Sequence, residues 1–345
     1  MINPLSIVMQ IRALSKLRVF IKSTIKKNEV MKPGVYKIHW AEKPILYDID
    51  NPPALIKKAP IVFPKFLLAF FSRSIIVRGG RPKFLGEYAL ISLNKEMKVF
   101  STVNKEVLSL MSPDKCEFLR FAASKLDKLN TTFLRVNEYG VVERWISNTT
   151  TNRDCIYTLF LDDYKKYITN TTIEEIRPMQ DYWRKFPTKN KDIASLFDIL
   201  SNRIGNERYP VVFSHCDMHL GNMLYENEIL WYIDLEYARI EIFFYDVYIG
   251  MVVAFWDNGD ESLLRRYLQK DPSLIIKIKE IFNAIGYPFC EESRKKYLYA
   301  FLAARLLFDL KNGKKRFGKI NYMRYQNYLV KKNRQIIRFI EDVHD

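Results

Sequence analysis

Cysteine is scarce in this sequence, which holds only four among 345 residues. Cys116, Cys155, Cys216 and Cys290 lie far apart, and no two of them form a C-x-x-C motif. Small secreted domains that rely on disulfides carry a denser set of cysteines. The spacing therefore excludes a disulfide scaffold and predicts reduced thiols in a cytoplasmic protein.

A long uncharged hydrophobic run is absent as well. Basic residues interrupt the apolar positions of the first 30 residues, which leaves no signal-peptide core of the required length. The most apolar stretch, 61–77, contains Pro64, Lys65 and Arg73, whereas a membrane-spanning helix needs roughly 20 largely uncharged residues. We therefore expect neither a signal peptide nor a transmembrane segment.

Glycine is also rare, at 12 of 345 residues, about half the usual share, which suits a helix-rich protein. The predicted long helices all follow residue 149 and cover 172–185, 191–204, 260–285 and 291–311. Before it we predict one short helix at 103–111 and short strands at 75–78, 87–93, 96–101, 132–136 and 141–146. The sequence thus predicts an α+β fold in which a small antiparallel-sheet lobe precedes a larger helical lobe.

Acidic residues are few at both ends of the chain. Residues 1–85 hold 16 basic and 4 acidic side chains, residues 294–345 hold 14 and 4, and the stretch between them holds 25 and 31. The formal charge of +16 therefore comes from the two flanks, where it favours an anionic partner. No nucleic-acid-binding motif accompanies this charge, and we expect no nucleic acid partner.

Residues 1–73 are predicted to form a basic N-terminal extension. Within it Ile7, Ile11, Ile21 and Ile25 recur at helical spacing beside basic residues, a pattern typical of an amphipathic helix. Such a helix can lie on an anionic membrane surface. It can equally pack on its own domain with its lysines in solvent, and the sequence leaves both interpretations open.

One segment carries a recognisable chemical pattern. His215 stands two residues before Asp217, Asn222 follows five residues after it, and Asp234 comes after the apolar stretch 229–233. Protein kinases use this spacing for a catalytic Asp and two metal ligands. A carboxylate can accept the proton of an attacking hydroxyl, and hard oxygen ligands can hold Mg²⁺ on ATP phosphates. The alternative is that these are ordinary turn and capping residues.

The wording of this segment is equally informative. The sequence reads H-C-D-M-H-L-G-N-M-L at 215–224 and I-D-L-E-Y-A at 233–238, followed by Asp246. It resembles the aminoglycoside phosphotransferase and choline kinase superfamily, whose pattern runs H-G-D-x-H-x-x-N-x-L, then I-D-x-E-x-A, then a further Asp. The resemblance covers about 211–248 and departs at Cys216, where Gly or Asn is usual.

The resemblance implies a bilobal protein-kinase-like fold that uses ATP and Mg²⁺. Asp217 would be the catalytic base, while Asn222 and Asp234 would bind Mg²⁺. Asp246 and His215 would hold the loop in place.

Two further residues of the motif have less defined roles. Glu236 would lie near the metal site. His219 would brace the backbone of the loop; its other interpretation, a zinc site shared with His215, lacks a third ligand at a recognisable spacing.

An ATP kinase also needs a cation for the phosphates, which the first lobe should supply. Lys98, on the predicted strand 96–101, resembles the lysine of the kinase pattern. Glu106, at the start of the predicted helix 103–111, would pair with it, and Lys95 is the reserve candidate. The alternative for Lys98 is a solvated residue at the edge of a sheet.

Two short segments are the remaining candidates for nucleotide contacts. Gly79 and Gly80 would cover the phosphates or form a plain turn. Trp145, Ile146 and Ser147 would provide a backbone hinge for adenine, unless Trp145 is an ordinary core aromatic. The predicted domains are the extension at 1–73, a nucleotide-binding lobe at 74–148 and a lobe at 149–345 with the catalytic loop, the metal site and the acceptor side.

Charge is the guide to the acceptor hydroxyl. Eight basic residues accumulate in a region that frames the acceptor side in this superfamily: Arg294, Lys295, Lys296, Arg305, Lys311, Lys314, Lys315 and Arg316. We therefore predict phosphorylation of a saccharide hydroxyl on an anionic or lipid-linked glycan, at the cytoplasmic face of a membrane with an anionic surface.

Two alternatives stay open. A choline or aminoglycoside kinase needs an acidic or aromatic pocket for its cation, and Trp256, Asp257, Asp260 and Glu261 would form one, unless they are a polar loop between helices. A non-catalytic kinase-like module would use its basic surface to bind membrane or nucleic acid. The complete set of motif residues argues against this second alternative.

Overall fold

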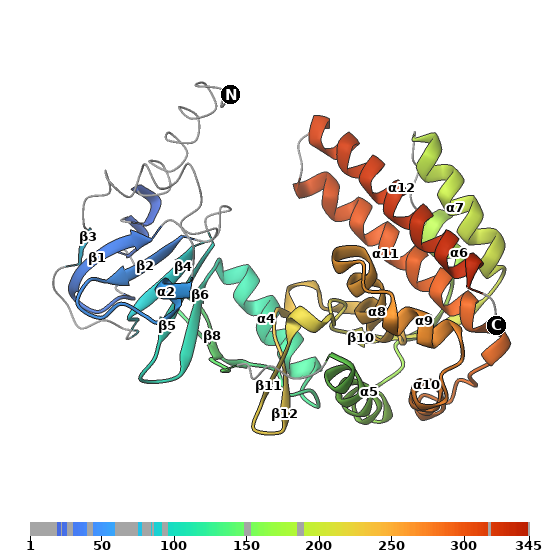
Figure 1. Ribbon diagram of the computed structural model, residues 1–345, viewed down its shortest axis with the longest axis horizontal. Helices are drawn as coiled ribbons and strands as arrows, with labels where there is room; N and C mark the ends of the chain where they lie inside the picture. Colours follow the sequence, from blue (N-terminus) through green and yellow to red (C-terminus); the bar gives the residue numbers. More distant parts are fainter. Residues whose placement is uncertain are drawn as a thin grey trace. The chain divides into compact units, whose positions relative to one another are not determined.

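The computed structural model describes the chain as two compact units. The first comprises Met1–Phe121 and Thr132–Ile146, and the second comprises Ala122–Thr131 and Ser147–Asp345. The described residues are 19–21, 23–25, 30–39, 44–58, 75–77, 84, 86–91, 96–147, 153–184, 190–316 and 319–343. Figure 1 shows a sheet in the first unit and mainly helices in the second.

An antiparallel sheet forms the first unit. Its described strands follow the order β3-β1-β2-β4-β5-β6-β8-β7. Their bounds are Gly34–His39 (β1), Ile45–Asp48 (β2), Ile75–Val77 (β3), Tyr88–Ile91 (β4), Met97–Ser101 (β5), Glu106–Leu110 (β6), Phe133–Asn137 (β7) and Gly140–Arg144 (β8). The helices described beside them are Leu55–Lys58 (α2) and Pro113–Lys125 (α4).

One face of this sheet is packed and the other is mixed. Along β5, Met97 and Val99 are buried while Lys98 and Phe100 are only partly buried, as the two-residue period of a strand requires. Ile21 and Ile25 join the same core as Met97 and Val99 and are almost fully buried. These positions of the N-terminal segment therefore pack on their own domain, as one of the two interpretations proposed.

The sheet departs from the sequence prediction in two places. The helix predicted at 103–111 is wrong, because β6 pairs with β5 through residues 106–110. A tight turn precedes β6, with Lys105 at φ 51°, and this turn returns the chain along β5. The predicted extension at 1–73 also contains β1 and β2, and β2 pairs directly with β4.

The second unit is built mainly from helices. Its helices are Arg153–Thr169 (α5), Gln180–Arg184 (α6), Lys191–Ile204 (α7), Tyr245–Asn258 (α8), Ser262–Leu268 (α9), Pro272–Ala284 (α10), Arg294–Arg316 (α11) and Lys319–Asp342 (α12). The short helical turns are Leu220–Asn222 (η1), Leu235–Tyr237 (η2) and Glu291–Ser293 (η3). The packed group of α7, α11 and α12 is visible in Figure 1.

Two small antiparallel sheets complete the second unit. The first has the order β13-β10-β9, formed by Arg239–Ile242 (β13), Arg208–Ser214 (β10) and Glu175–Pro178 (β9). The second is a hairpin of Met223–Glu226 (β11) and Ile229–Tyr232 (β12). These strands bracket the segment that carries the kinase-like motif.

The predicted helices meet different outcomes. The prediction for 191–204 is confirmed, because Asn190 caps the amide groups of Asp192 and Ile193 at the start of α7. The prediction at 260–285 becomes two helices, since Asp271 and Pro272 begin α10 anew. The first half of 172–185 is wrong because the chain forms β9, whose last residue is a proline.

The predicted α+β fold, with a sheet-based first unit and a larger helical second unit, is confirmed. Across the described ranges, no helix combines the length and the low polarity needed to cross a membrane.

Candidate active site

A sharp turn after strand β10 begins the motif segment. β10 is buried from Tyr209 to Ser214, and the chain then adopts a φ of 63° at Cys216. This left-handed conformation favours Gly or Asn, which explains why those residues are usual here in the superfamily pattern. In this chain Cys216 is fully buried, and its Sγ lies 3.8 Å from the carbonyl oxygen of Arg239.

Asp246 holds this turn through two hydrogen bonds to its backbone. It lies in the first turn of α8, is fully buried, and accepts hydrogen bonds from the backbone N–H groups of His215, at 2.9 Å, and Cys216, at 2.7 Å. Burial raises the pKa of Asp246 to about 7, although both backbone bonds act in the opposite direction. The predicted structural role of Asp246 thus has a direct geometric basis.

His215 connects the loop to the Asp234 segment. Its ring is buried, and Nε2 donates to the carbonyl oxygen of Ile233 at 2.8 Å. Burial lowers the pKa of His215, so the ring is neutral at physiological pH. The N–H of Ile233 donates to the carbonyl of Asn222 at 3.1 Å. The two motif segments are therefore joined by one ring-to-backbone bond and one backbone–backbone bond.

Three side chains contact Asp217. Asn222 Nδ2 donates to the carboxylate Oδ2 at 3.0 Å and to the backbone carbonyl at 2.9 Å. His219 Nε2 lies 3.7 Å from Oδ2, and Arg305 Nη1 lies 3.7 Å from Oδ1. Burial raises the pKa of Asp217, but His219 and Arg305 outweigh it and hold the pKa below its ordinary value. Asp217 is therefore an oriented carboxylate, the form that can accept a proton.

His219 also braces the loop. Its Nδ1 accepts a hydrogen bond from the backbone N–H of Gly221 at 3.1 Å. Among the residues that the structure describes, no group of three or more His, Cys, Asp and Glu side chains is arranged to hold a metal ion. The contacts therefore favour the bracing interpretation over a zinc site.

Asn222 and Asp234 are the two predicted magnesium ligands. Both hydrogen bonds of the buried Asn222 amide use Nδ2, which leaves its Oδ1 as the possible ligand. Asp234 adopts φ 59° and ψ 58° before η2 and uses no side-chain bond to cap that turn. Magnesium sites commonly combine one or two protein oxygens with waters and substrate phosphates, so this donor set fits such an ion. Glu236, two residues further on, is exposed.

Comparison with known proteins supports this geometry. Residues 169–274, which contain the motif residues from His215 to Asp246, match a family model described as the phosphotransferase enzyme family, APH. This segment is therefore similar to that family. The match confirms the resemblance that the sequence motif indicated. No sequence among the curated proteins matches the chain.

Several solved structures are similar to the chain. A choline/ethanolamine kinase family protein from Mesorhizobium loti is 13% identical with a TM-score of 0.44, over 70% of this chain and 85% of that one. The choline kinase LicA from Streptococcus pneumoniae is 14% identical with a TM-score of 0.45, over 70% and 90%. Aminoglycoside phosphotransferase APH(4)-Ia is 13% identical with a TM-score of 0.46, over 79% and 97%.

Arg305 supplies a contact to Asp217 that the motif does not reveal. It lies on α11, where its Nε donates to Asp309 Oδ2 at 3.0 Å while Nη1 approaches Asp217. Asp309 is buried and holds the guanidinium through this bond. An Arg and an Asp four residues apart in the otherwise apolar stretch 297–310 are the sequence signal that would have indicated this pair.

Besides Arg305, three of the eight carboxyl-terminal basic residues make bonds within the protein. Arg294 is buried and donates to the carbonyls of Leu268 and Glu291, at 3.0 and 3.1 Å. Lys295 donates to the carbonyl of Val343, and Lys296 pairs with the carboxylate of Glu207.

The predicted basic acceptor surface is therefore reduced. Among its members whose side chains are described, Lys311 remains exposed, while Arg305 faces Asp217. The side chains of Lys314, Lys315 and Arg316 lie outside those that the structure describes.

The proposed pocket for a cationic substrate already holds a cation of the chain. Lys332 on α12 donates to Asp257 at 2.9 Å, and its Nζ lies 5.6 Å from the Trp256 ring centroid and 4.7 Å from that of Tyr328. We call Trp256, Asp257 and Tyr328 the Lys332 box.

The two other acidic residues of that prediction have partners as well. Glu261 accepts from Arg265 at 2.7 Å, and Asp260 accepts from the Ser262 hydroxyl at 2.7 Å. These contacts favour the polar-loop interpretation.

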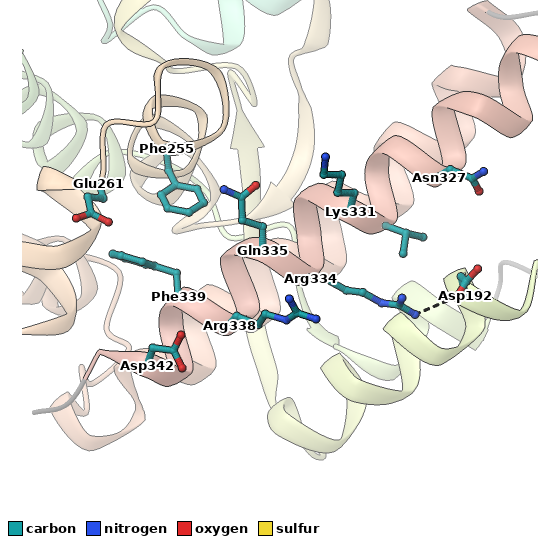
Figure 2. A pocket seen from close by; sticks show the side chains of 11 residues that line it. Asp192, Phe255, Glu261, Asn327, Lys331, Arg334, Gln335, Arg338, Phe339 and Asp342 are labelled. Atoms are coloured by element: carbon teal, nitrogen blue, oxygen red, sulfur yellow. Dashed lines mark hydrogen bonds and ion pairs between the residues drawn. The ribbon is translucent and has the colours of Figure 1, made fainter.

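A separate groove runs along α12, which we call the α12 groove. It has a volume of about 760 Å³ and includes Phe255, Lys331 and Arg338. Figure 2 shows Arg334 of α12 bonded across it to Asp192 of α7, a contact of 3.0 Å. None of its lining residues belongs to the 215–222 loop or contacts Asp217.

The two candidates Lys98 and Glu106 lie on opposite faces of the first-unit sheet, Lys98 on the mixed face and Glu106 on the face of Val99 and Leu108. Lys98, on β5, stands opposite Ser109 of β6, and both residues share the mixed face with Glu143, which accepts from the Ser109 hydroxyl at 3.1 Å. Glu106 begins β6 and does not head a helix. Its carboxylate makes two bonds to Arg135, at 2.7 and 2.8 Å, so Arg135 has the place beside Glu106 that we predicted for Lys98.

The remaining first-unit predictions are only partly described. The ring of Trp145 contacts Tyr88 and Phe100 edge-on, with centroids 6.2 and 5.9 Å apart, which fits the packing interpretation. Ile146 is buried and Ser147 exposed. Gly79, Gly80 and Lys95 lie outside the described residues.

Proposed function

We propose that this protein transfers the γ-phosphoryl group of ATP to a hydroxyl group of a small molecule, with Mg²⁺ as cofactor. The observation that carries the proposal is the carboxylate of Asp217, which is oriented by Asn222 and kept ionised by its neighbours. It lies in the segment that matches the phosphotransferase family model. The proposed base, the two proposed metal ligands and the family match thus lie in one segment of the chain.

In the proposed reaction, the acceptor hydroxyl donates its proton to Asp217. The acceptor oxygen then forms a bond to the γ-phosphorus, and the bond between that phosphorus and the bridging oxygen breaks, so that ADP leaves with the electron pair. When bound, Mg²⁺ on Asn222 and Asp234 would neutralise charge on the phosphates. His215 and Asp246 keep the loop in the conformation in which these side chains converge.

Nucleotide contacts from the first unit are a further part of the proposal. Lys98 is the proposed phosphate-binding cation, supported by its position on the unpacked face of the sheet. The backbone of 145–147 is the proposed adenine hinge. Glu106 has no part in it, because its carboxylate is engaged by Arg135.

The acceptor is proposed to be a saccharide. More specifically, it is proposed to be an anionic or lipid-linked glycan. The excess of basic residues at both ends of the chain supports the anionic form. The occupied Lys332 box gives less support to a choline or aminoglycoside kinase. Membrane-face association is tested by deleting residues 1–18, which leaves Ile21 and Ile25 in the core; unchanged binding to vesicles rich in phosphatidylserine would contradict it.

The activity itself is tested by measuring ADP release from ATP and Mg²⁺ in the presence of neutral saccharides, sugar phosphates, choline and an aminoglycoside. We expect release to depend on one acceptor class and on the metal, and to be lost in Asp217→Asn. Acceptor-stimulated release at the normal rate in Asp217→Asn would overturn the assignment of the base.

A further inference from the structure

A second cavity lies in the second unit. It has a volume of about 350 Å³ and is bounded by β9, α6, β13 and α11. Its charged lining residues are Glu175, Arg177, Asp181, Arg239, Glu241 and Lys311. This volume is at the lower end of the roughly 300–1,000 Å³ of typical small-molecule sites, and we call it the α11 cavity.

Two connections join the α11 cavity to the 215–222 loop. Arg239 pairs with Ser214 across the sheet, and its carbonyl oxygen contacts Cys216 beside Asp217. Phe308, which also lines the cavity, has the Arg239 guanidinium 3.9 Å from its ring centroid and the Arg305 guanidinium 5.7 Å away. Arg305 in turn approaches Asp217. The lining residue Phe308 is therefore connected to the proposed base through one side chain, Arg305.

The charges of the cavity are balanced and arranged in pairs. Three lining residues are basic and three are acidic. Arg177 Nε donates to Glu175 at 2.7 Å, and Arg239 Nε donates to Glu241 at 3.3 Å. An isolated phosphate or ammonium group would gain little from these two pairs, because each of their charges already has an opposite charge beside it, and the lining as a whole carries no net charge.

The same groups suit hydroxyl groups well. A sugar hydroxyl both donates and accepts hydrogen bonds, and it needs fixed acceptors and fixed donors close together. Tyr182 is buried and donates to Glu241, while Arg177 Nη1 reaches the Tyr182 oxygen at 3.2 Å. These bonds leave further N–H donors on Arg177 and lone pairs on the carboxylates, all held in place before a ligand arrives.

The cavity also offers apolar surface. The ring of Phe308 and the side chain of Ile240, which is 40% exposed, both line it. Sugar rings present C–H groups as well as hydroxyl groups, so a lining that mixes paired charges with an aromatic ring matches both.

We propose that the α11 cavity binds the phosphoryl acceptor as a neutral saccharide and directs one of its hydroxyl groups to Asp217. This inference rests on the proposed function and names its substrate class. If the acceptor is a larger glycan, its neutral sugar unit enters the cavity and its anionic or lipid part stays outside. The α12 groove is larger but has no connection to Asp217, and it therefore serves as the control surface.

The test measures binding without turnover, in the full chain carrying Asp217→Asn. Glucose, N-acetylglucosamine and maltose are the neutral probes, with glucose 6-phosphate and choline as charged probes, and calorimetry reports the affinities. We expect a neutral probe to bind, Lys311→Gln or Asp181→Asn to weaken it about tenfold, and the matched Lys331→Gln in the α12 groove to leave it unchanged.

The outcomes separate the two proposals. Binding of only the charged probes, or equal effects of Lys311→Gln and Lys331→Gln, would overturn the cavity assignment. The binding measurement in the Asp217→Asn variant requires no catalysis. Neutral saccharide binding that is sensitive to Lys311→Gln therefore upholds the inference even if the wild-type chain transfers no phosphoryl group. Absence of transfer by the wild-type chain would instead refute the proposed function.

Discussion

The 215–222 loop and the mixed face of the first-unit sheet hold their polar side chains in different ways. In the loop, the buried Asp246 and His215 bond to backbone groups, so the loop conformation and its side chains depend on each other. On the sheet face, side chains bond to one another, as Ser109 does to Glu143. A change in the loop should therefore affect both folding and chemistry, whereas a change on the sheet face should have a small, local effect.

The largest expected effect is that of Asp217→Asn on the proposed chemistry. Loss of a positioned general base lowers kcat by about 10²–10⁴-fold, while the amide preserves the shape of the side chain. The measurement is single-turnover phosphoryl transfer, with thermal unfolding as a check on the fold. A variant that kept at least half of the wild-type rate would remove Asp217 from the mechanism.

Asp246→Asn should come next, with its effect on stability. An amide in place of the carboxylate leaves one of two buried N–H donors without an acceptor, which costs about 1–3 kcal/mol. Denaturant unfolding at pH 5 measures this loss. Asp198→Asn, a change at an exposed position of α7, is the matched control and should change the unfolding free energy by less than about 0.5 kcal/mol.

The same variant tests a pH dependence. The folded-state pKa of Asp246, about 7, lies above the ordinary value of about 3.9. The folded state therefore binds this proton more tightly, and the stability that it contributes is lost as pH rises from about 4 to 7, by at most about 1.4 kcal/mol per pH unit. The stability difference between wild type and Asp246→Asn should shrink over this range; a constant difference from pH 5 to 8 would contradict the raised pKa.

A smaller loss is expected for Arg305→Met. Removing the guanidinium releases one constraint on Asp217 and should lower kcat about tenfold, or about 1.4 kcal/mol, with the KM for ATP within twofold. Arg305→Lys should recover part of the rate because it restores the charge. Arg203→Met, which breaks an ion pair with Glu341, is the control, and a loss of rate as large as that of Arg305→Met would show a general effect of removing arginine.

The smallest effect should follow Glu106→Gln in the first-unit sheet, at the ion pair with Arg135. Arg135 is about half exposed in this ion pair, and exposed pairs contribute roughly 0–1 kcal/mol. Chemical denaturation should therefore show a loss of less than about 1 kcal/mol that diminishes in high salt. A loss of unfolding free energy above 3 kcal/mol would mean that the fold depends on this ion pair as strongly as on the buried bonds of the loop.

The sequence predicted the motif residues because their contacts are local. His215, Asp217 and Asn222 lie within eight consecutive residues, and a fixed spacing along such a loop determines which side chains meet. The Asp234 segment could be added because a short hairpin returns the chain to Asn222. Periodicity alone likewise located α7, whose caps stand beside it in the sequence.

The remaining features depend on contacts between distant segments. Arg305 is far from Asp217 in sequence, so its place at the site follows from the packing of α11 and from nothing in the motif. Glu106 was assigned to a helix because pairing with β5, which makes it a strand residue, is a tertiary effect. The predicted helix at 172–185 failed for the same reason, since β9 exists only beside β10.

The Lys332 box has a consequence for specificity. Two aromatic rings and a carboxylate form the kind of site that proteins use for ammonium ligands, and here the chain carries its own ammonium group as a permanent occupant. A free cation would have to expel a tethered competitor whose local concentration is far above its own. As long as Lys332 occupies the box, these two rings and the carboxylate serve the packing of α12.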